Sequence, residues 1–290
     1  LLRTARALEG NAFQSALQAE LTKGDSFAAA RQRAVAALLS PSDAALLSSP
    51  NNTLGIEYGR ALLRVGAAPA LFTIPRTGAA HDATPENAGG YSASAIRHLL
   101  AEGRRADALS RMVPAMRAVY EAEETAGRAP VFAAACERAI LARLRSMTPA
   151  EFDGLDSGHE GVGQRLYNAS RNAATLDAVL DNAKTKRYAY ARLRRMVLWA
   201  YLGLTPAKLP ASVPYLRVLA ANEIGRALLG RMRKTARLPV ITKPAAIRSL
   251  FPDAQRLFEI ESRAADLYAL AYPELTEVCG SLWRQNPVMP

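Results

Sequence analysis

Apolar residues recur at helical spacing along most of this chain. Residues 12–21, 26–39 and 53–65 each repeat them every three or four positions, and a glycine directly follows the third stretch. This spacing predicts one amphipathic helix in each stretch. Residues 70–74 differ, because they form a short apolar run between two prolines. Such a run predicts a buried β-strand, the one strand that the sequence indicates clearly.

The order of these elements points to an α/β sheet. A glycine-containing loop over residues 75–90 follows the predicted strand, and a helix follows from Ser94. Helix, strand, loop and helix in this order is typical of a parallel α/β sheet. A solitary buried strand would leave its backbone donors and acceptors without partners. We therefore expect partner strands upstream of Leu1, outside these 290 residues.

From about residue 117 onward the pattern is almost entirely helical. Thr148, Pro149 and Glu151 form a strong helix start, with Thr as the cap and Glu reaching back to it. Residues 238–242 are expected to be a short extended piece. Four longer stretches are expected to be helices: residues 165–182, 185–202, 215–232 and 254–271. The predicted fold class is mainly α with a partial α/β part.

The charge balance favours a polyanionic partner. Lys and Arg number 37 and Asp and Glu 26, which gives a net charge of +11 and points first to nucleic acid. No run of 18 apolar residues and no signal peptide is visible, so we expect no membrane segment. Cys136 and Cys279 form no C-x-x-C pair, which suits the cytoplasm. The three histidines lack metal-ligand spacing, so no metal site is expected.

A seat for an anion is predicted where the helix after the glycine-containing loop begins. Ser92 and Ser94 lie just before or within its first turn, and Arg97 follows. The first amides of a helix lack intrahelical partners and carry partial positive charge, so hydroxyls and a guanidinium beside them favour a phosphate. The alternative is that Ser92 or Ser94 only caps the helix.

A second cluster of charge lies between residues 184 and 195. Six cations occur there in twelve residues without an acid: Lys184, Lys186, Arg187, Arg192, Arg194 and Arg195. On one continuous helix, Lys184, Tyr188, Arg192 and Arg195 would share a face. Guanidinium groups bind phosphates bidentately, and a tyrosine can stack on an unpaired base, so this face predicts RNA contact. The alternative is a solvated basic face paired with carboxylates from elsewhere.

Three segments together carry a resemblance to a known family. They are residues 49–58 (Ser-Pro-Asn-Asn-Thr-Leu-Gly-Ile-Glu-Tyr), residues 76–82 followed by the serines and arginine of 92–97, and residues 184–196. Together they resemble the tRNA(Met) cytidine acetate ligase family, a branch of the nucleotidyltransferase superfamily. The first and third segments are specific, whereas the serine-rich segment is shared across the superfamily.

The resemblance implies a two-step reaction. Acetate attacks the α-phosphate of ATP to give acetyl-adenylate and pyrophosphate. The exocyclic amine of the wobble cytidine of elongator tRNA(Met) then takes the acetyl group and releases AMP. Mg²⁺ is expected to accompany ATP by the chemistry of the triphosphate.

The implied division is a C-terminal portion of a Rossmann-like, ATP-binding nucleotidyltransferase domain over residues 1–116 and an all-helical tRNA-binding domain over residues 117–290. The expected ATP contacts are Asn51, Arg76, Thr77, Ser94 and Arg97. The expected tRNA contacts are Lys184, Lys186, Arg187, Tyr188, Arg192 and Arg195. Turn and helix capping is the alternative role for Asn51, and a surface ion pair is the alternative for Arg76.

The sequence also departs from the family's pattern. The H-x-G-H motif that steadies the phosphates during adenylyl transfer does not occur in these 290 residues, and Ala80 stands where a tyrosine is usual. We therefore expect the later part of the ATP domain and the whole helical domain, no catalytic residue in this chain, and no acetyl-adenylate formation by the chain alone. Two alternatives stay open: another adenylyltransferase of the same superfamily, and a non-catalytic helical RNA-binding module.

Overall fold

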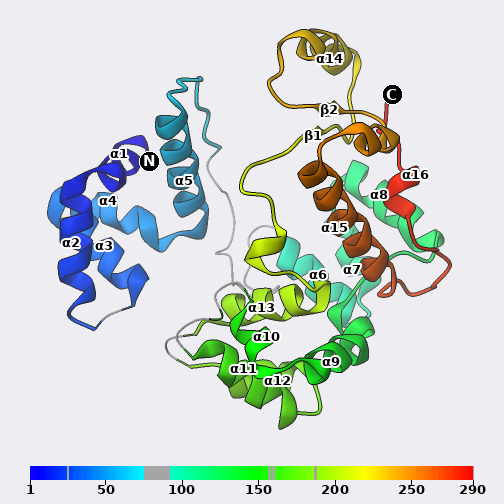
Figure 1. Ribbon diagram of the computed structural model, residues 1–290, viewed down its shortest axis with the longest axis horizontal. Helices are drawn as coiled ribbons and strands as arrows, with labels where there is room; N and C mark the ends of the chain where they lie inside the picture. The colour runs from blue at the N-terminus through cyan, green and yellow to red at the C-terminus, as the bar shows by residue number, and fades with distance from the viewer. Residues whose placement is uncertain (25, 75–91, 156–157, 159–160, 186–187, 290) are drawn as a thin grey trace. The chain divides into compact units, whose positions relative to one another are not determined.

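The computed structural model describes residues 1–290 except 25, 75–91, 156–157, 159–160, 186–187 and 290. The chain divides into two compact units, Leu1–Arg76 and Thr77–Pro290. Helices dominate the described part of both units, and the named strands there are two residues long (Figure 1). None of the described helices is long and apolar enough to cross a membrane.

The first unit is a small helical assembly whose core is lined by one side of each helix. Its elements are α1 (Leu2–Glu9), α2 (Asn11–Leu21), α3 (Phe27–Leu38), α4 (Pro41–Ala45), η1 (Leu46–Ser48) and α5 (Pro50–Val65). Leu8, Phe13, Val35 and Ile56 are buried together in the core. A Cβ at Gly59 would lie 3.1 Å from the Cβ of Ala5, so glycine lets α5 approach α1 closely. The helices predicted over residues 12–21, 26–39 and 53–65 are confirmed.

Ion pairs join the two ends of the first unit. Glu9 at the end of α1 accepts from Arg60 Nε at 2.6 Å and from Arg64 Nε at 2.8 Å, and both arginines belong to α5. The hydrogen bond from Arg64, followed by that from Arg60, lowers the pKa of Glu9 to about 2. Arg3 similarly donates to both carboxylate oxygens of Asp43, at 2.8 and 2.6 Å.

The strand predicted over residues 70–74 is wrong for this structure. Those residues have no regular secondary structure, and Phe72 and Ile74 are 91% and 93% exposed. No strand lies beside them in the described residues of the chain. An apolar run becomes a strand only when its backbone groups find partners in a ladder, and local sequence cannot supply those partners.

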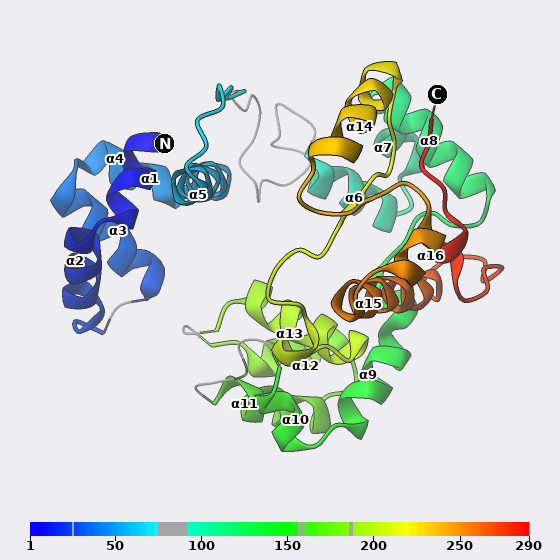
Figure 2. The same cartoon turned by 45° about the horizontal axis from the view of Figure 1, so that its top comes forward.

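The second unit contains two cores. Its elements are α6 (Ala93–Ala101), α7 (Arg105–Ser110), α8 (Pro114–Thr125), η3 (Ala133–Cys136), α9 (Glu137–Ser146), α10 (Pro149–Asp153), α11 (Val162–Arg171), α12 (Leu176–Ala183), α13 (Tyr190–Leu202), η4 (Pro206–Lys208), β1 (Leu216–Arg217), α14 (Glu223–Thr235), β2 (Val240–Ile241), η5 (Pro244–Ser249), α15 (Pro252–Ala269) and α16 (Ser281–Arg284). Figures 1 and 2 both show α9–α13 gathered into one group. Leu144, Phe152, Leu166 and Met196 are fully buried in the core of that group.

The second core of this unit joins α15 to a minimal βαβ unit. Strands β1 and β2 pair in parallel, with Leu216 opposite Val240, and α14 is the connection between them. Phe258 of α15 is buried there, and its ring lies 4.5 Å from that of Trp283 in an edge-to-face arrangement. The expected extended piece over residues 238–242 is thus confirmed by β2.

Three predicted helices differ from the observed ones. The helix predicted over residues 215–232 is wrong at its start, because β1 occupies that part and α14 begins only after its N-cap, Asn222. Residues 165–182 form two helices, because Thr175 caps the second one by accepting from Ala178 N at 3.2 Å. The helix predicted over residues 185–202 begins at Tyr190.

Other expectations about the helices hold. Thr148 and Glu151 form the capping box that starts α10, with Thr148 N donating to Glu151 Oε2 at 2.8 Å. Helix α15 matches the helix expected over residues 254–271. The division between the two compact units falls between residues 76 and 77 of the chain. The expected boundary at residue 116 separates functions rather than compact units and stays a prediction.

We predict that Glu9→Gln lowers the thermal midpoint of the first unit at neutral pH. The pKa of Glu9 lies below its ordinary value of 4.5 in the folded chain, so its stabilising contribution is present above pH 4.5 and is lost as the pH falls toward about 2. Circular dichroism melts from pH 7 to pH 2 should show the two chains converging over that range. Glu223→Gln, at a well-exposed carboxylate, is the control. Equal midpoints of wild type and Glu9→Gln at pH 7 would contradict the prediction.

Candidate functional site

The start of α6 has local features of an anion-binding site. Ser92 is the N-cap and accepts a hydrogen bond from Ala95 N at 3.1 Å, so capping by Ser92 is confirmed. Ser94 and Arg97 are exposed on the first turn, where Arg97 Nη2 lies 3.5 Å from Ser94 Oγ. Helix α6 is held to the unit by buried Ala95 and Leu99 on its other side. A hydroxyl, a guanidinium and the positive end of a helix therefore meet at one exposed place.

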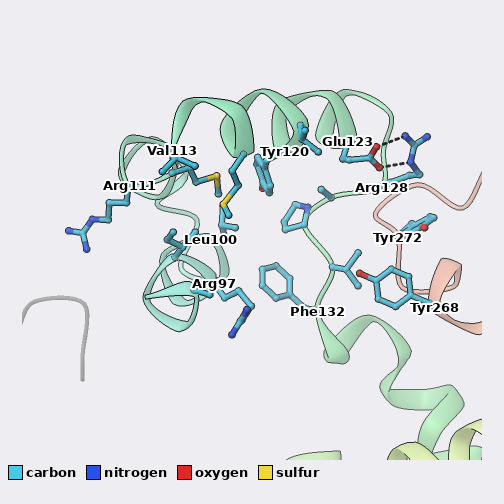
Figure 3. Close-up of a pocket in the computed structure, with 18 residues that line it drawn as sticks. Arg97, Leu100, Arg111, Val113, Tyr120, Glu123, Arg128, Phe132, Tyr268 and Tyr272 are labelled. Atoms are coloured by element: carbon cyan, nitrogen blue, oxygen red, sulfur yellow. Dashed lines mark hydrogen bonds and ion pairs between the residues drawn. The ribbon is translucent and has the colours of Figure 1, made fainter. Parts of the chain in front are cut away.

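A pocket of about 880 Å³ opens beside this helix end. Its lining comes from α6, α8, the segment before η3, and the end of α15 with the residues after it. Figure 3 shows Leu100, Tyr120 and Phe132 pointing toward the cavity, with Tyr268 and Tyr272 on a further side. The walls are mainly apolar and aromatic, which is the usual composition of a site for a small organic group.

Charged groups lie at three places around this pocket. Arg97 lines it on the α6 side, and Arg111 lines it just before α8. On another side Arg128 grips Glu123 with two hydrogen bonds, from Nε at 2.6 Å and from Nη2 at 2.8 Å. The hydrogen bond from Arg128 lowers the pKa of Glu123, so that carboxylate stays ionised and neutralises its partner. Burial raises the pKa of Tyr120, so its hydroxyl stays protonated.

Asn51 lies in the other unit, in the first turn of α5. Ser49 is the N-cap of this helix and Pro50 its first residue, so neither Asn51 nor Asn52 is the capping residue. Asn51 is exposed. Its amide can therefore offer both a donor and an acceptor to a ligand, as the sequence predicts.

Four of the predicted site residues lie outside the described residues. They are Arg76 and Thr77 of the ATP set and Lys186 and Arg187 of the tRNA set. Their roles stay predictions.

The residues from 184 to 195 do not form one helical face. Lys184 follows α12 with extended backbone, its Nζ donates to Thr185 O at 2.9 Å, and α13 begins only at Tyr190. The predicted face shared by Lys184, Tyr188 and Arg192 is therefore wrong. The helical spacing of apolar residues is weak before residue 190, and the cationic run itself does not distinguish a helix from a loop.

Tyr188 is part of the core rather than of the surface. Its side chain is 7% exposed among the buried residues of α9–α13, and Arg192 lies over its ring at 5.3 Å. Stacking of Tyr188 on an unpaired base does not fit this position. Arg194 and Arg195 are exposed on α13, and Tyr190 is the exposed aromatic residue beside them, 5.8 Å below the Arg194 guanidinium.

Comparison with known proteins gives the family. The HIGH Nucleotidyl Transferase family matches residues 1–280, which is nearly all of this sequence. The chain belongs to the HIGH Nucleotidyl Transferase family. The resemblance that the motifs predicted is confirmed.

Several relatives of this chain are named tRNA(Met) cytidine acetate ligase. A protein of Acetivibrio thermocellus named tRNA(Met) cytidine acetate ligase is 31% identical over 278 residues, which cover 91% of this chain and 66% of the relative. The protein of that name from Thermotoga maritima is 28% identical over 300 residues, which cover 97% of this chain and 72% of the relative. The chain thus spans about two thirds of the length of the first relative.

Solved structures share the fold of this chain. The crystal structure of Thermotoga maritima TmcAL in an apo form matches with a TM-score of 0.90 and 27% identity, and covers 99% of this chain and 73% of that one. The structure of the same protein bound with alpha-thio ATP matches with a TM-score of 0.89 over 99% of this chain and 72% of that one.

Sequence reasoning missed the aromatic wall of the pocket and the surface tyrosine. Phe132, Tyr268 and Tyr272 come from segments far apart in the chain, and no local spacing indicates that they meet. The apolar positions of α8 had a detectable signal, because Met116, Val119 and Tyr120 recur at helical spacing. That spacing predicts an apolar face but not what lies opposite it.

We predict that Tyr188→Ala costs about 3 to 5 kcal/mol of unfolding free energy, as removal of a buried aromatic ring does. Tyr190→Ala should cost about 1 kcal/mol or less, because that side chain is at the surface. Urea denaturation followed by circular dichroism measures both. Similar small losses for the two variants would show that Tyr188 is not a core residue.

Proposed function

We propose that this chain belongs to an ATP-dependent ligase that forms N4-acetylcytidine at the wobble position of elongator tRNA(Met). The observation that carries the proposal is the match over 99% of the chain to a TmcAL structure bound with alpha-thio ATP, together with relatives named tRNA(Met) cytidine acetate ligase. The net charge of +11 supports a nucleic-acid substrate.

The proposed chemistry has two steps. A carboxylate oxygen of acetate bonds to the α-phosphorus of ATP, and pyrophosphate leaves. The cytidine N4 then bonds to the carbonyl carbon of acetyl-adenylate, AMP leaves, and the amine gives up a proton. Both steps place negative charge near phosphate, which cationic and amide donors stabilise.

The residues of this chain supply binding and orientation in that scheme. Ser94, Arg97 and the first amides of α6 are proposed to hold phosphate oxygens. Asn51, Arg76 and Thr77 are proposed as further ATP contacts, and the amide of Asn51 suits a base or ribose group. Residues 1–116 would then be the C-terminal portion of a Rossmann-like nucleotide domain. Residues 117–290, with the exposed cations of α13, would hold the tRNA.

Mg²⁺ is proposed to arrive with ATP, held by phosphate oxygens. The described residues contain no group of three or more His, Cys, Asp and Glu side chains that could hold a metal ion. The cytoplasm is the proposed compartment, which the free thiols of Cys136 and Cys279 support.

A non-catalytic RNA-binding module is the second candidate. The observation that favours it is the net charge of +11, which supports RNA binding without requiring a catalytic residue. Such a module would bind tRNA with steep salt dependence and would not bind ATP. Another adenylyltransferase of the superfamily is less well supported, because a small acceptor would not need the cationic helical part.

Equilibrium binding separates these candidates. The chain is titrated with ATP and, separately, with a tRNA(Met) transcript. Binding of both ligands supports the ligase, and tRNA binding without ATP binding supports the module. Absence of tRNA binding at low salt would overturn the proposal.

Arg76→Ala is expected to weaken ATP binding by about tenfold or more, because a hydrogen bond from a charged group is worth about 1.5 to 3 kcal/mol. Arg6→Ala, an exposed cation of the same unit, is the control. Calorimetric titration with ATP gives both affinities. An unchanged affinity of Arg76→Ala would remove that residue from the site.

Arg192→Glu together with Arg195→Glu is expected to weaken tRNA(Met) binding by more than about tenfold at 0.1 M salt, through loss of phosphate contacts. ATP affinity should stay unchanged. Arg117→Glu with Arg256→Glu changes the net charge equally and is the control. Filter binding and ATP titration measure the outcome, and equal loss of both ligands would mean that the two arginines have a structural role.

A further inference from the structure

Helix α14 concentrates positive charge that the family motifs did not point to. From Glu223 to residue 237 there are five cations and one acid. The cations are Arg226, Arg231, Arg233, Lys234 and Arg237, and all are exposed. Figure 1 shows α14 at the end of its unit away from α10–α12.

The attachment of α14 leaves these cations facing outward. Gly225, Leu229 and Met232 are half-buried and recur at helical spacing, so they mark the side that faces the rest of the unit. Leu229 shares a shallow hollow with Val218 and Val288. The cations lie on the remaining sides.

Carboxylates lie close to other arginines of this unit but not to most of the cations of α14. Arg105 lies 2.6 Å from Glu124, and Arg128 lies 2.6 Å from Glu123. On α14 the closest pair is Arg226 with Glu223, at 3.9 Å. Within the described ranges, Arg231, Arg233, Lys234 and Arg237 have no carboxylate oxygen within 4.0 Å.

Like charges on one helix surface repel one another. Arg231 and Lys234 are three residues apart on α14, which is a spacing of neighbouring side chains on a helix. Cations near the end of a helix gain some stabilisation from its dipole. That gain does not require exposed charge on the earlier turns, where Arg226 and Arg231 lie. A polyanion laid along the helix would relieve the repulsion.

The backbone holds this cationic surface in place. The chain enters α14 from β1 and leaves it toward β2, and these strands pair through Leu216 N to Pro239 O at 2.8 Å and Val218 N to Ile241 O at 2.9 Å. Val288 adds a bond on the entering side, since Ala221 N donates to Val288 O at 3.0 Å. Both ends of the helix are therefore fixed to the unit.

We propose that the exposed cations of α14 and Arg237 form an RNA-backbone contact surface, separate in sequence from residues 184–195. This inference rests on the proposed function, because tRNA is the polyanion it supplies. Guanidinium and ammonium groups bind phosphate oxygens without reading the base sequence, so the surface fixes the position of the tRNA rather than selecting it.

An anionic membrane surface is the competing partner. Ile224 and Leu228 are 81% and 53% exposed beside the cations, and a basic amphipathic helix can lie on a membrane. The apolar side of α14 is too restricted for that role, because Leu229 and Met232 face the protein. The small exposed apolar area of α14 therefore favours RNA over a membrane.

The test compares a triple variant with the wild-type chain. Arg231→Gln, Arg233→Gln and Lys234→Gln together should weaken binding of a tRNA(Met) transcript about tenfold or more at 0.1 M salt, and should make the slope of log affinity against log salt shallower by about 2 to 3. The matched control is Lys23→Gln, Arg117→Gln and Arg256→Gln, which removes three cations that pair with a carboxylate three or four residues away in the sequence. The control should keep the wild-type slope.

The outcomes separate this inference from the proposed function. If the wild-type chain does not bind tRNA, the proposed function fails. If it binds and the triple variant keeps the wild-type affinity and slope, the α14 surface is overturned while the proposed function stands. Equal losses in the triple variant and the control would also overturn it, because net charge alone would explain them. Loss of binding to phosphatidylserine vesicles with unchanged tRNA binding would assign the surface to a membrane instead.

Discussion

Charge pairing is the constraint on which the functional surfaces of this chain depend. The sequence has 37 Lys and Arg side chains but only 26 carboxylates, so some cations must remain uncompensated. In the first unit Glu9 and Asp43 bind arginines from other helices, and these bonds help close a small core. Among the described residues, part of this surplus lies along α14, where Arg226 pairs with Glu223. The same electrostatics therefore stabilises one part of the chain and, in the proposed function, attracts a polyanion to another.

The proposed nucleotide contacts rest on a different principle. A helix end offers unpaired amides whatever its sequence, and Ser94 and Arg97 add a hydroxyl and a cation on the exposed side of α6. Next to them lies an apolar pocket whose aromatic wall is assembled from distant segments. Phosphate binding at the helix end and an organic group in the pocket are compatible with one extended ligand.

Local spacing predicted most of the helices, because most of them bury one stripe of their own residues. Helices α2, α3, α5 and α15 follow apolar repeats, and the capping box of α10 could be read directly from Thr148 and Glu151. Residues 70–74 and β1 show the limit of this approach. An apolar run needs a partner to become a strand, and residues 70–74 have none among the described residues. Leu216 forms a strand because Val240 lies opposite it.

The candidate site, like the fold, could be predicted from the sequence only in part. The Ser92 cap and the exposure of Ser94, Arg97 and Asn51 agree with reasoning from short motifs. The predicted exposure of Tyr188 was wrong, because its burial depends on packing in the core of α9–α13 and not on the cations near it in the sequence. The basic surface of α14 was visible in composition, but its importance depends on the absence of nearby carboxylates, which only the fold of the described residues determines.

Mapping of ultraviolet cross-links between the chain and a tRNA(Met) transcript tests the central claim most directly. Mass spectrometry of the cross-linked peptides should find RNA adducts within residues 188–195 and 223–237, and competing salt should reduce both together. Adducts confined to the first unit, or none at either surface under conditions where the complex forms, would contradict the assignment of the uncompensated cations to RNA.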